Sequence, residues 1–138
     1  MTAGTHGSTF GGNPLAMTVA SEVVDIVPRP GFLDQVRSNG ERLSRGLKAL
    51  TADFPDLFED VRGEGLLLGL KCGRPVRDVA QAAREHGLLT VIAGDDVLRI
   101  LPPINVSIQE IEEGVTRLRS TALSLSLPGR TTPALSEE

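Results

Sequence analysis

A glycine-rich run near the start of the chain has the residue types of an anion-binding loop. From residue 4 to residue 16 it reads GTHGSTFGGNPLA, and the Asn-Pro pair within it is typical of a helix start. Glycine lets a backbone approach an anion closely, hydroxyls donate hydrogen bonds, and the first turn of a helix offers unpaired N–H groups. Ser8 and Thr9 are therefore candidate phosphate ligands. The alternative is an ordinary turn whose hydroxyls satisfy nearby backbone groups.

The phosphate loop of nucleotide-binding proteins is excluded by the residues that follow. Gly7 and Gly12 have the spacing of that loop, but Asn13 and Pro14 stand where it needs lysine followed by serine or threonine. The lysine that reaches the outer phosphates of a nucleotide is missing from this position.

Arg99 is the second candidate, because it interrupts the apolar run VLRIL at 97–101. A guanidinium among apolar residues needs an anionic partner. That partner could be the carboxylate of a ligand, or it could be Asp95 or Asp96 in a structural ion pair. Strand alternation also allows an outward-facing arginine, on the face opposite Leu98.

The other reactive side chains have ordinary structural interpretations. His6 lies in a loop without a carboxylate to orient it, and Cys72, at a strand end, is a small hydrophobe. Arg62 and Glu64 flank a glycine turn, where we expect them to set backbone geometry and form a surface ion pair. Two histidines and one cysteine give no metal-ligand cluster.

Composition limits the class of protein. The chain has 138 residues, a net charge of −4 and a pI near 5.2, which argue against nucleic acid or an anionic membrane as the main partner. No apolar run reaches the roughly 18 residues that a bilayer span needs. A single cysteine fits a cytoplasmic protein best.

Hydrophobic spacing predicts the elements that position these residues. Helices are expected at 14–27, 32–53 and 75–86 and after a capping box at 107–110; strands are expected at 58–62, 66–71, 88–92 and 97–101. Helices beside a small, mainly antiparallel sheet make an α+β domain. Residues 127–138 lack periodicity, so we expect a disordered tail.

Three segments, in the same order, resemble class III (ornithine/acetylornithine-type) pyridoxal-phosphate aminotransferases, the acetylornithine branch most of all. They are GTHGSTFGGNPLA, VRGEGLLLG at 61–69 and AGDDVLRILPP at 93–103. The resemblance implies the C-terminal small domain of a fold-type I aminotransferase. In that scheme 1–27 is the end of the large domain, 28–126 the small domain and 127–138 the tail.

The resemblance also implies roles for the candidate residues. Thr9 would bind the phosphate of pyridoxal phosphate across the interface of a homodimer, and Ser8 would lie near the substrate. Arg99 would hold the substrate α-carboxylate. The parent reaction would move an amino group from N-acetylornithine, or a related ω-amino acid, to 2-oxoglutarate in arginine biosynthesis.

The chain departs from the family in one respect. The family attaches its cofactor to a lysine upstream of the glycine-rich loop, and the chain's two lysines, Lys48 and Lys71, both lie downstream of it. The carboxylate and the aromatic residue that contact the cofactor ring also belong upstream. We therefore expect a C-terminal fragment without a catalytic residue, inactive alone. A non-catalytic module that pairs with a full-length transaminase and a free-standing phosphate-binding protein are the alternatives.

Overall fold

The computed structural model describes residues 7–126. His6 and the expected tail at 127–138 lie outside the described residues. The chain divides into two compact units, the first ending at Gln35 and the second beginning at Val36, and each is described by itself. The expected domain boundary after residue 27 stays a prediction.

The first unit contains a loop and helix α1 (Pro14–Ile26). Asn13 caps the helix, its side-chain oxygen accepting a hydrogen bond from the Ala16 N–H at 3.0 Å, and Pro14 occupies the first helical position, where no N–H is needed. Both features match the sequence prediction. No residue of α1 is buried, and most of its apolar side chains are exposed.

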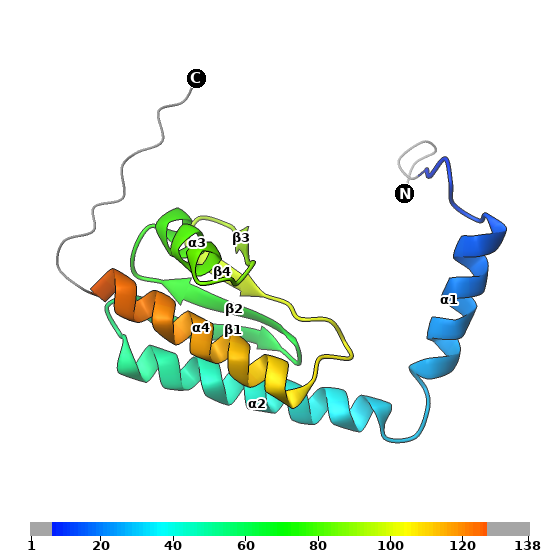
Figure 1. Ribbon diagram of the computed structural model, residues 1–138, viewed down its shortest axis with the longest axis horizontal. Helices are drawn as coiled ribbons and strands as arrows, with labels where there is room; N and C mark the ends of the chain where they lie inside the picture. The colour runs from blue at the N-terminus through cyan, green and yellow to red at the C-terminus, as the bar shows by residue number, and fades with distance from the viewer. Residues whose placement is uncertain (1–6, 127–138) are drawn as a thin grey trace. The chain divides into compact units, whose positions relative to one another are not determined.

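The second unit is an antiparallel sheet covered by helices (Figure 1). Helix α2 (Phe32–Asp53) begins in the first unit and continues into the second. It is followed by β1 (Phe58–Glu64), β2 (Leu67–Cys72), α3 (Val76–Glu85), β3 (Val91–Ala93), β4 (Val97–Ile100) and α4 (Ile108–Ser126). The strand order is β1-β2-β4-β3, and every neighbouring pair is antiparallel. The predicted α+β class is confirmed.

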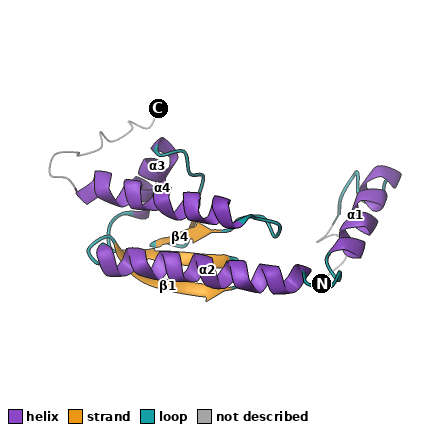
Figure 2. Ribbon diagram, turned by 60° about the horizontal axis from the view of Figure 1, so that its bottom comes forward, coloured by secondary structure: helices purple, strands orange, loops and turns teal. Residues whose placement is uncertain are grey.

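The core lies between one face of the sheet and the helices (Figure 2). Leucines recur along α2 at the spacing of one helical face, so they point toward the sheet together. Alternate residues of β2 and β4 meet them from the sheet. The buried apolar residues include Leu43, Leu47, Leu50, Phe58, Leu68, Leu70, Val79, Leu98, Ile111 and Leu118. The opposite face of the sheet carries the alternating partners, which include Gly69 and Arg99.

The turn between β1 and β2 differs from the expectation. Gly63 was expected in a three-residue turn, but it belongs to β1 and pairs with Leu68. Its φ is 108°, and a Cβ atom there would lie 2.1 Å from the Leu67 carbonyl oxygen. Only glycine adopts this conformation without strain. Because Gly63 can therefore pair within the ladder, β1 continues to Glu64. Strand β3 is shorter than expected and begins at Val91.

Helix α4 begins with the predicted capping box. The Ser107 N–H and hydroxyl each donate to the Glu110 carboxylate at 2.8 Å, and the Glu110 N–H donates to the Ser107 hydroxyl at 3.2 Å. These bonds satisfy groups that a helix end leaves unpaired. The pKa of Glu110 is lowered, first by the Ser107 N–H and then by its hydroxyl.

Candidate functional site

The glycine-rich loop presents two hydroxyls to solvent. Ser8 and Thr9 are exposed, and among residues 7–126 neither hydroxyl has a hydrogen-bond partner. The turn is held by its backbone instead, because the Gly11 N–H donates to the Ser8 carbonyl at 3.3 Å. Within residues 7–126, no hydrogen bond supports the alternative that these hydroxyls satisfy the backbone of the turn. Gly12, with φ of 77°, lets the chain turn into the helix.

Asn13 ties this loop to the helix that follows. Its side-chain oxygen caps α1, while its side-chain amide donates to the Phe10 carbonyl. The two bonds fix where the turn ends relative to the first N–H groups of the helix. An anion contacted by the loop would lie close to the positive end of the helix dipole.

Arg99 lies on the face of the sheet away from the helices. Arg99 is half-buried in the middle of β4, and its neighbour Leu98 is fully buried on the other face. Arg62, Gly69 and Arg99 pair directly across three adjacent strands. Gly69 has no side chain, and a methyl group of Val97 lies over it instead.

The acidic residues beside Arg99 do not neutralise it. Within the part of the chain that the structure describes, no hydrogen bond or ion pair holds the Arg99 guanidinium. The alternative pairing with Asp95 or Asp96 is thus absent there. Asp96 instead lies 3.9 Å from the Lys71 ammonium group. A half-buried guanidinium without a structural partner is suited to an incoming carboxylate.

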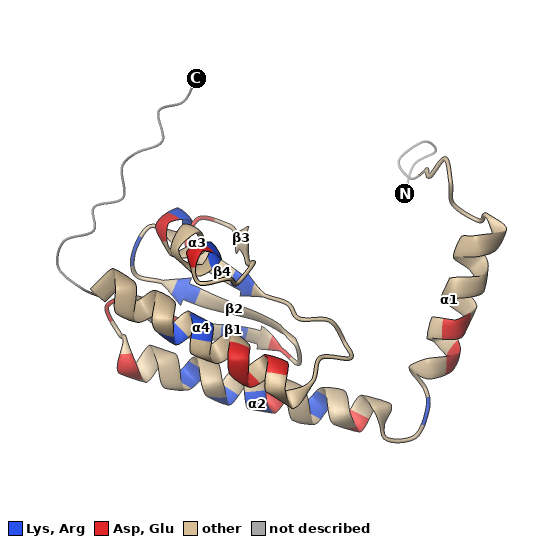
Figure 3. Ribbon diagram, in the orientation of Figure 1, with Lys and Arg blue, Asp and Glu red and all other residues tan. Residues whose placement is uncertain are grey.

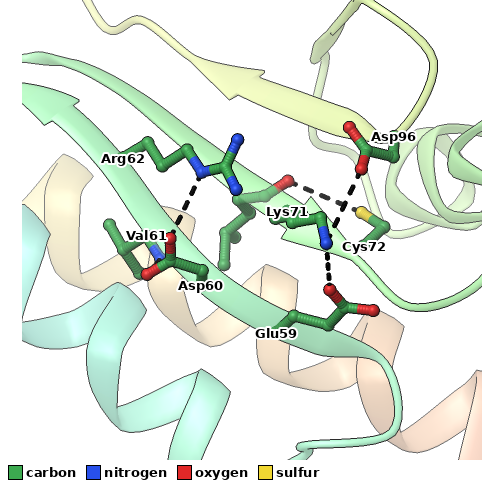
Figure 4. A network of polar contacts seen from close by, with 8 residues as sticks. Glu59, Asp60, Val61, Arg62, Lys71, Cys72 and Asp96 are labelled. Carbon is green, nitrogen blue, oxygen red and sulfur yellow. Dashed lines mark hydrogen bonds and ion pairs between the residues drawn. The ribbon is translucent and has the colours of Figure 1, made fainter.

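The other two cations of this face already have partners (Figure 4). Arg62 pairs with Asp60 at 3.2 Å, rather than with Glu64, and both side chains are more than half exposed. The Lys71 ammonium donates to the Glu59 carboxylate. This hydrogen bond, and the charge of the same carboxylate, raise the pKa of Lys71. Both cations are therefore structural in this chain.

Neither lysine has the properties of a nucleophilic amine. Lys48 is exposed on α2. Lys71 has a raised pKa, whereas a lysine that attacks a carbonyl needs a lowered one. Acidic and basic residues lie side by side along α2 and α4, so these helices present mixed, solvated faces (Figure 3).

Cys72 is a structural residue, as predicted. It is buried at the end of β2, and loss of hydration raises the pKa of its thiol to about 11. A thiol in this state is a poor nucleophile.

Among the described residues no group of three or more His, Cys, Asp and Glu side chains could hold a metal ion. No helix between residues 7 and 126 is long and apolar enough to cross a bilayer.

Gly69 is the residue that the sequence analysis missed. A Cβ atom on it would lie 2.7 Å from a methyl carbon of Val97, so the strand has no room for a side chain beside Arg99. An isolated glycine within a strand often marks a close approach by a ligand or another backbone. In the sequence, the isolated glycine within LLLGLKC at 66–72 is the signal that could have identified this position.

Comparisons with known proteins identify relatives of this chain. The family described as Aminotransferase class-III matches residues 1–122. The acetylornithine aminotransferase of Mesorhizobium japonicum is 50% identical over 126 residues, covering 91% of this chain and 32% of the relative. That of Rhodobacter capsulatus is 49% identical over 125 residues, again covering 91% and 32%.

A solved structure has the same fold. The acetylornithine aminotransferase of Elizabethkingia anophelis superposes with a TM-score of 0.75 at 29% identity, covering 90% of this chain and 33% of that one. This chain therefore spans about a third of the length of the proteins it matches. Because the family pattern covers most of its residues, the chain belongs to the class-III aminotransferase family.

Proposed function

We propose that the chain is the C-terminal portion of a pyridoxal-phosphate aminotransferase that transfers an amino group from N-acetylornithine, or a related ω-amino acid, to 2-oxoglutarate. Arginine biosynthesis is the pathway this implies, in the cytoplasm. The printed names of the relatives support the substrate class. The observation that carries the proposal is the half-buried guanidinium of Arg99, which has no structural partner among residues 7–126.

Arg99 is the residue we assign to the substrate carboxylate. A guanidinium presents two parallel N–H donors that match the two oxygens of a carboxylate, so it fixes both position and orientation. Gly69, directly opposite Arg99 in the sheet, carries no side chain that could contact the guanidinium. Holding the α-carboxylate in this way would leave the amino group of the amino acid, or the oxo group of the oxo acid, free to face the cofactor.

Ser8 and Thr9 fit a phosphate, because both hydroxyls are exposed and without a partner in the described residues. We assign Thr9 to the phosphate of pyridoxal phosphate bound in the partner subunit of a homodimer, and Ser8 to the vicinity of the substrate. When bound, pyridoxal phosphate supplies an electron sink for the carbanion formed at the substrate carbon. The role of this chain's residues is to hold the anionic ends of cofactor and substrate.

The isolated chain is expected to have no transaminase activity, since neither Lys48 nor Lys71 is suited to attach the cofactor. The test compares the 138-residue chain with a polypeptide in which it replaces the matching third of the Mesorhizobium japonicum relative. With pyridoxal phosphate, N-acetylornithine and 2-oxoglutarate, turnover is expected only from the joined polypeptide. Turnover by the isolated chain that disappears in Lys48→Ala or Lys71→Ala would contradict the assignment.

The alternative function is a non-catalytic module that pairs with a full-length transaminase. The exposed apolar side chains of α1 favour it, because such a surface suits contact with another polypeptide. A module would bind the separate full-length enzyme and leave the joined polypeptide inactive. The proposed enzyme fragment predicts the opposite result for the joined polypeptide.

A further inference from the structure

Arg99 stands in a row of residues that crosses three strands of the sheet. Gly69 of β2 lies directly opposite it on one side, and Val91 of β3 lies directly opposite it on the other. Residues that pair directly across a ladder point to the same face of the sheet, and their Cβ atoms lie about 4.5–5.5 Å apart. The first part of the Arg99 side chain is therefore flanked by whatever occupies these two positions.

A methyl group of Val97 occupies the side that Gly69 leaves without a side chain. Val97 precedes Arg99 by two residues on β4, so both side chains stand on the same face. One of its methyl carbons lies 2.7 Å from the position that a Cβ atom of Gly69 would have. Because that position neighbours Arg99 across the ladder, the methyl group stands next to the start of the arginine side chain.

The two valines place apolar surface on both sides of the Arg99 stem. An arginine packs its methylene groups along apolar surface and keeps its guanidinium in water. Arg99 is half-buried, as expected for a covered stem and an accessible head. Valine is β-branched and has few χ1 rotamers, so it forms a stiff wall. Val91 is the weaker of the two walls, since 53% of its surface is exposed.

We propose that Val97 is a positioning residue, whose methyl group restrains the stem of Arg99 so that the guanidinium is already oriented when a carboxylate arrives. The inference rests on the proposed function, because it takes Arg99 to be the residue that binds the substrate carboxylate. A long side chain that is ordered beforehand loses less conformational freedom on binding. Gly69 is part of the same arrangement, since a Cβ atom there would displace the methyl group of Val97.

The first experiment measures the order of Arg99 in the 138-residue chain, without cofactor or substrate. ¹⁵N relaxation of the Arg99 Nε–H group gives its order parameter on the picosecond-to-nanosecond timescale. Val97→Ala should lower the order parameter, because the stem loses one wall. Val97→Thr should preserve it, because threonine keeps the branched shape. Val61→Ala is the matched control, since Val61 belongs to the same sheet but packs against the core.

The second experiment measures KM in the joined polypeptide. Val97→Ala should raise KM for N-acetylornithine and for 2-oxoglutarate by a similar factor of about two to ten, the scale of immobilising one long side chain. The factor is similar because both substrates carry an α-carboxylate. The kcat value and the retention of pyridoxal phosphate should change little. Val97→Thr should restore the wild-type KM values, and Val61→Ala should leave them unchanged.

A double-mutant cycle distinguishes action through Arg99 from a general effect on the fold. Substitutions of two residues that act together are not additive. A lysine at position 99 has no planar fork to orient, so Val97→Ala should raise KM less than twofold in the Arg99→Lys background. A purely structural role for Val97 predicts the same factor in both backgrounds.

Three results would overturn the inference. The first is an Arg99 order parameter that is the same in Val97→Ala and in the wild-type chain. The second is wild-type KM in Val97→Ala when Arg99→Lys does raise KM. The third is an equal effect of Val97→Ala in both backgrounds of the cycle. Unchanged KM in Arg99→Lys itself would instead contradict the proposed function, so the two failures are distinguishable.

Discussion

Arg99 lies directly opposite Gly69 in the β2–β4 ladder. Directly opposite residues of antiparallel strands have Cα atoms about 4.5–5.5 Å apart, so a side chain on residue 69 would stand beside the guanidinium stem. The nearest neighbour of that missing side chain is Val97, on the same face. The sheet register therefore places Val97, and not a side chain of residue 69, beside Arg99.

Gly69→Ala should destabilise the fold by about 1–3 kcal/mol, the usual cost of overpacking. The added methyl group would lie 2.7 Å from Val97, and one of the two must shift. Denaturant unfolding of the isolated chain measures the change. Gly114→Ala is the matched control, because its methyl group meets open space and should stabilise α4 by about 0.5–1 kcal/mol. Equal effects of the two substitutions would contradict the close contact at Gly69.

Arg99→Lys should weaken substrate binding in the joined polypeptide by about 1–3 kcal/mol. Lysine keeps the charge but loses the two parallel donors that match a carboxylate. The measurement is KM for both the amino donor and the oxo-acid acceptor. Arg62→Lys is the control, because Arg62 is exposed and already paired with Asp60. Unchanged KM values for both substrates in Arg99→Lys would remove the carboxylate role.

Thr9→Val should weaken retention of pyridoxal phosphate in the joined polypeptide by about 1.5–3 kcal/mol, the worth of one charge-assisted hydrogen bond. Equilibrium dialysis of the cofactor measures it. Thr18→Val serves as the control, since the Thr18 hydroxyl bonds to the Pro14 carbonyl within α1. Wild-type retention in Thr9→Val would mean that the loop is only a turn.

A mixed dimer tests whether Thr9 acts across the subunit interface. Thr9→Val subunits are combined with subunits that lack the upstream cofactor lysine. If Thr9 serves the partner's cofactor, one site of the mixed dimer carries both defects and the other is intact. Failure to recover an intact site would show that each loop serves its own subunit.

The capping box predicts how stability depends on pH. Because folding lowers the pKa of Glu110, its contribution is fully present above the ordinary pKa of a glutamate. The contribution is lost as the pH falls through the lowered value. The stability difference between the wild-type chain and Glu110→Gln should therefore shrink toward acid in denaturant unfolding. A difference that is constant between neutral and acid pH would contradict the role of the Ser107 bonds.

The elements with local signals were predictable from the sequence. The expected helix at 32–53 has the observed bounds, because its apolar spacing and the preceding Pro and Gly residues are local features. The capping box was predictable for the same reason. The position of the turn near Gly63 was not predictable, because a glycine can belong either to the turn or to the strand before it. Only the pairing of Gly63 with Leu68 decides between these two possibilities.

The candidate site was predictable in residue types but not in arrangement. Ser8, Thr9 and Arg99 stood out by residue type, although each also has an ordinary structural explanation, and the resemblance to aminotransferases implied their ligand roles. Their ligand roles remain predictions. The position of Gly69 opposite Arg99 depends on strand register, which is a long-range property that no single segment of sequence encodes.

Cys72 gives the chain an internal reporter of unfolding. It is the sole cysteine of the sequence, and with a thiol pKa of about 11 only about one molecule in ten thousand carries the reactive thiolate at pH 7. Burial shields it further. Alkylating reagents should therefore modify the folded chain slowly and the opened chain quickly, so the rate of labelling at Cys72 measures how often β2 leaves the sheet.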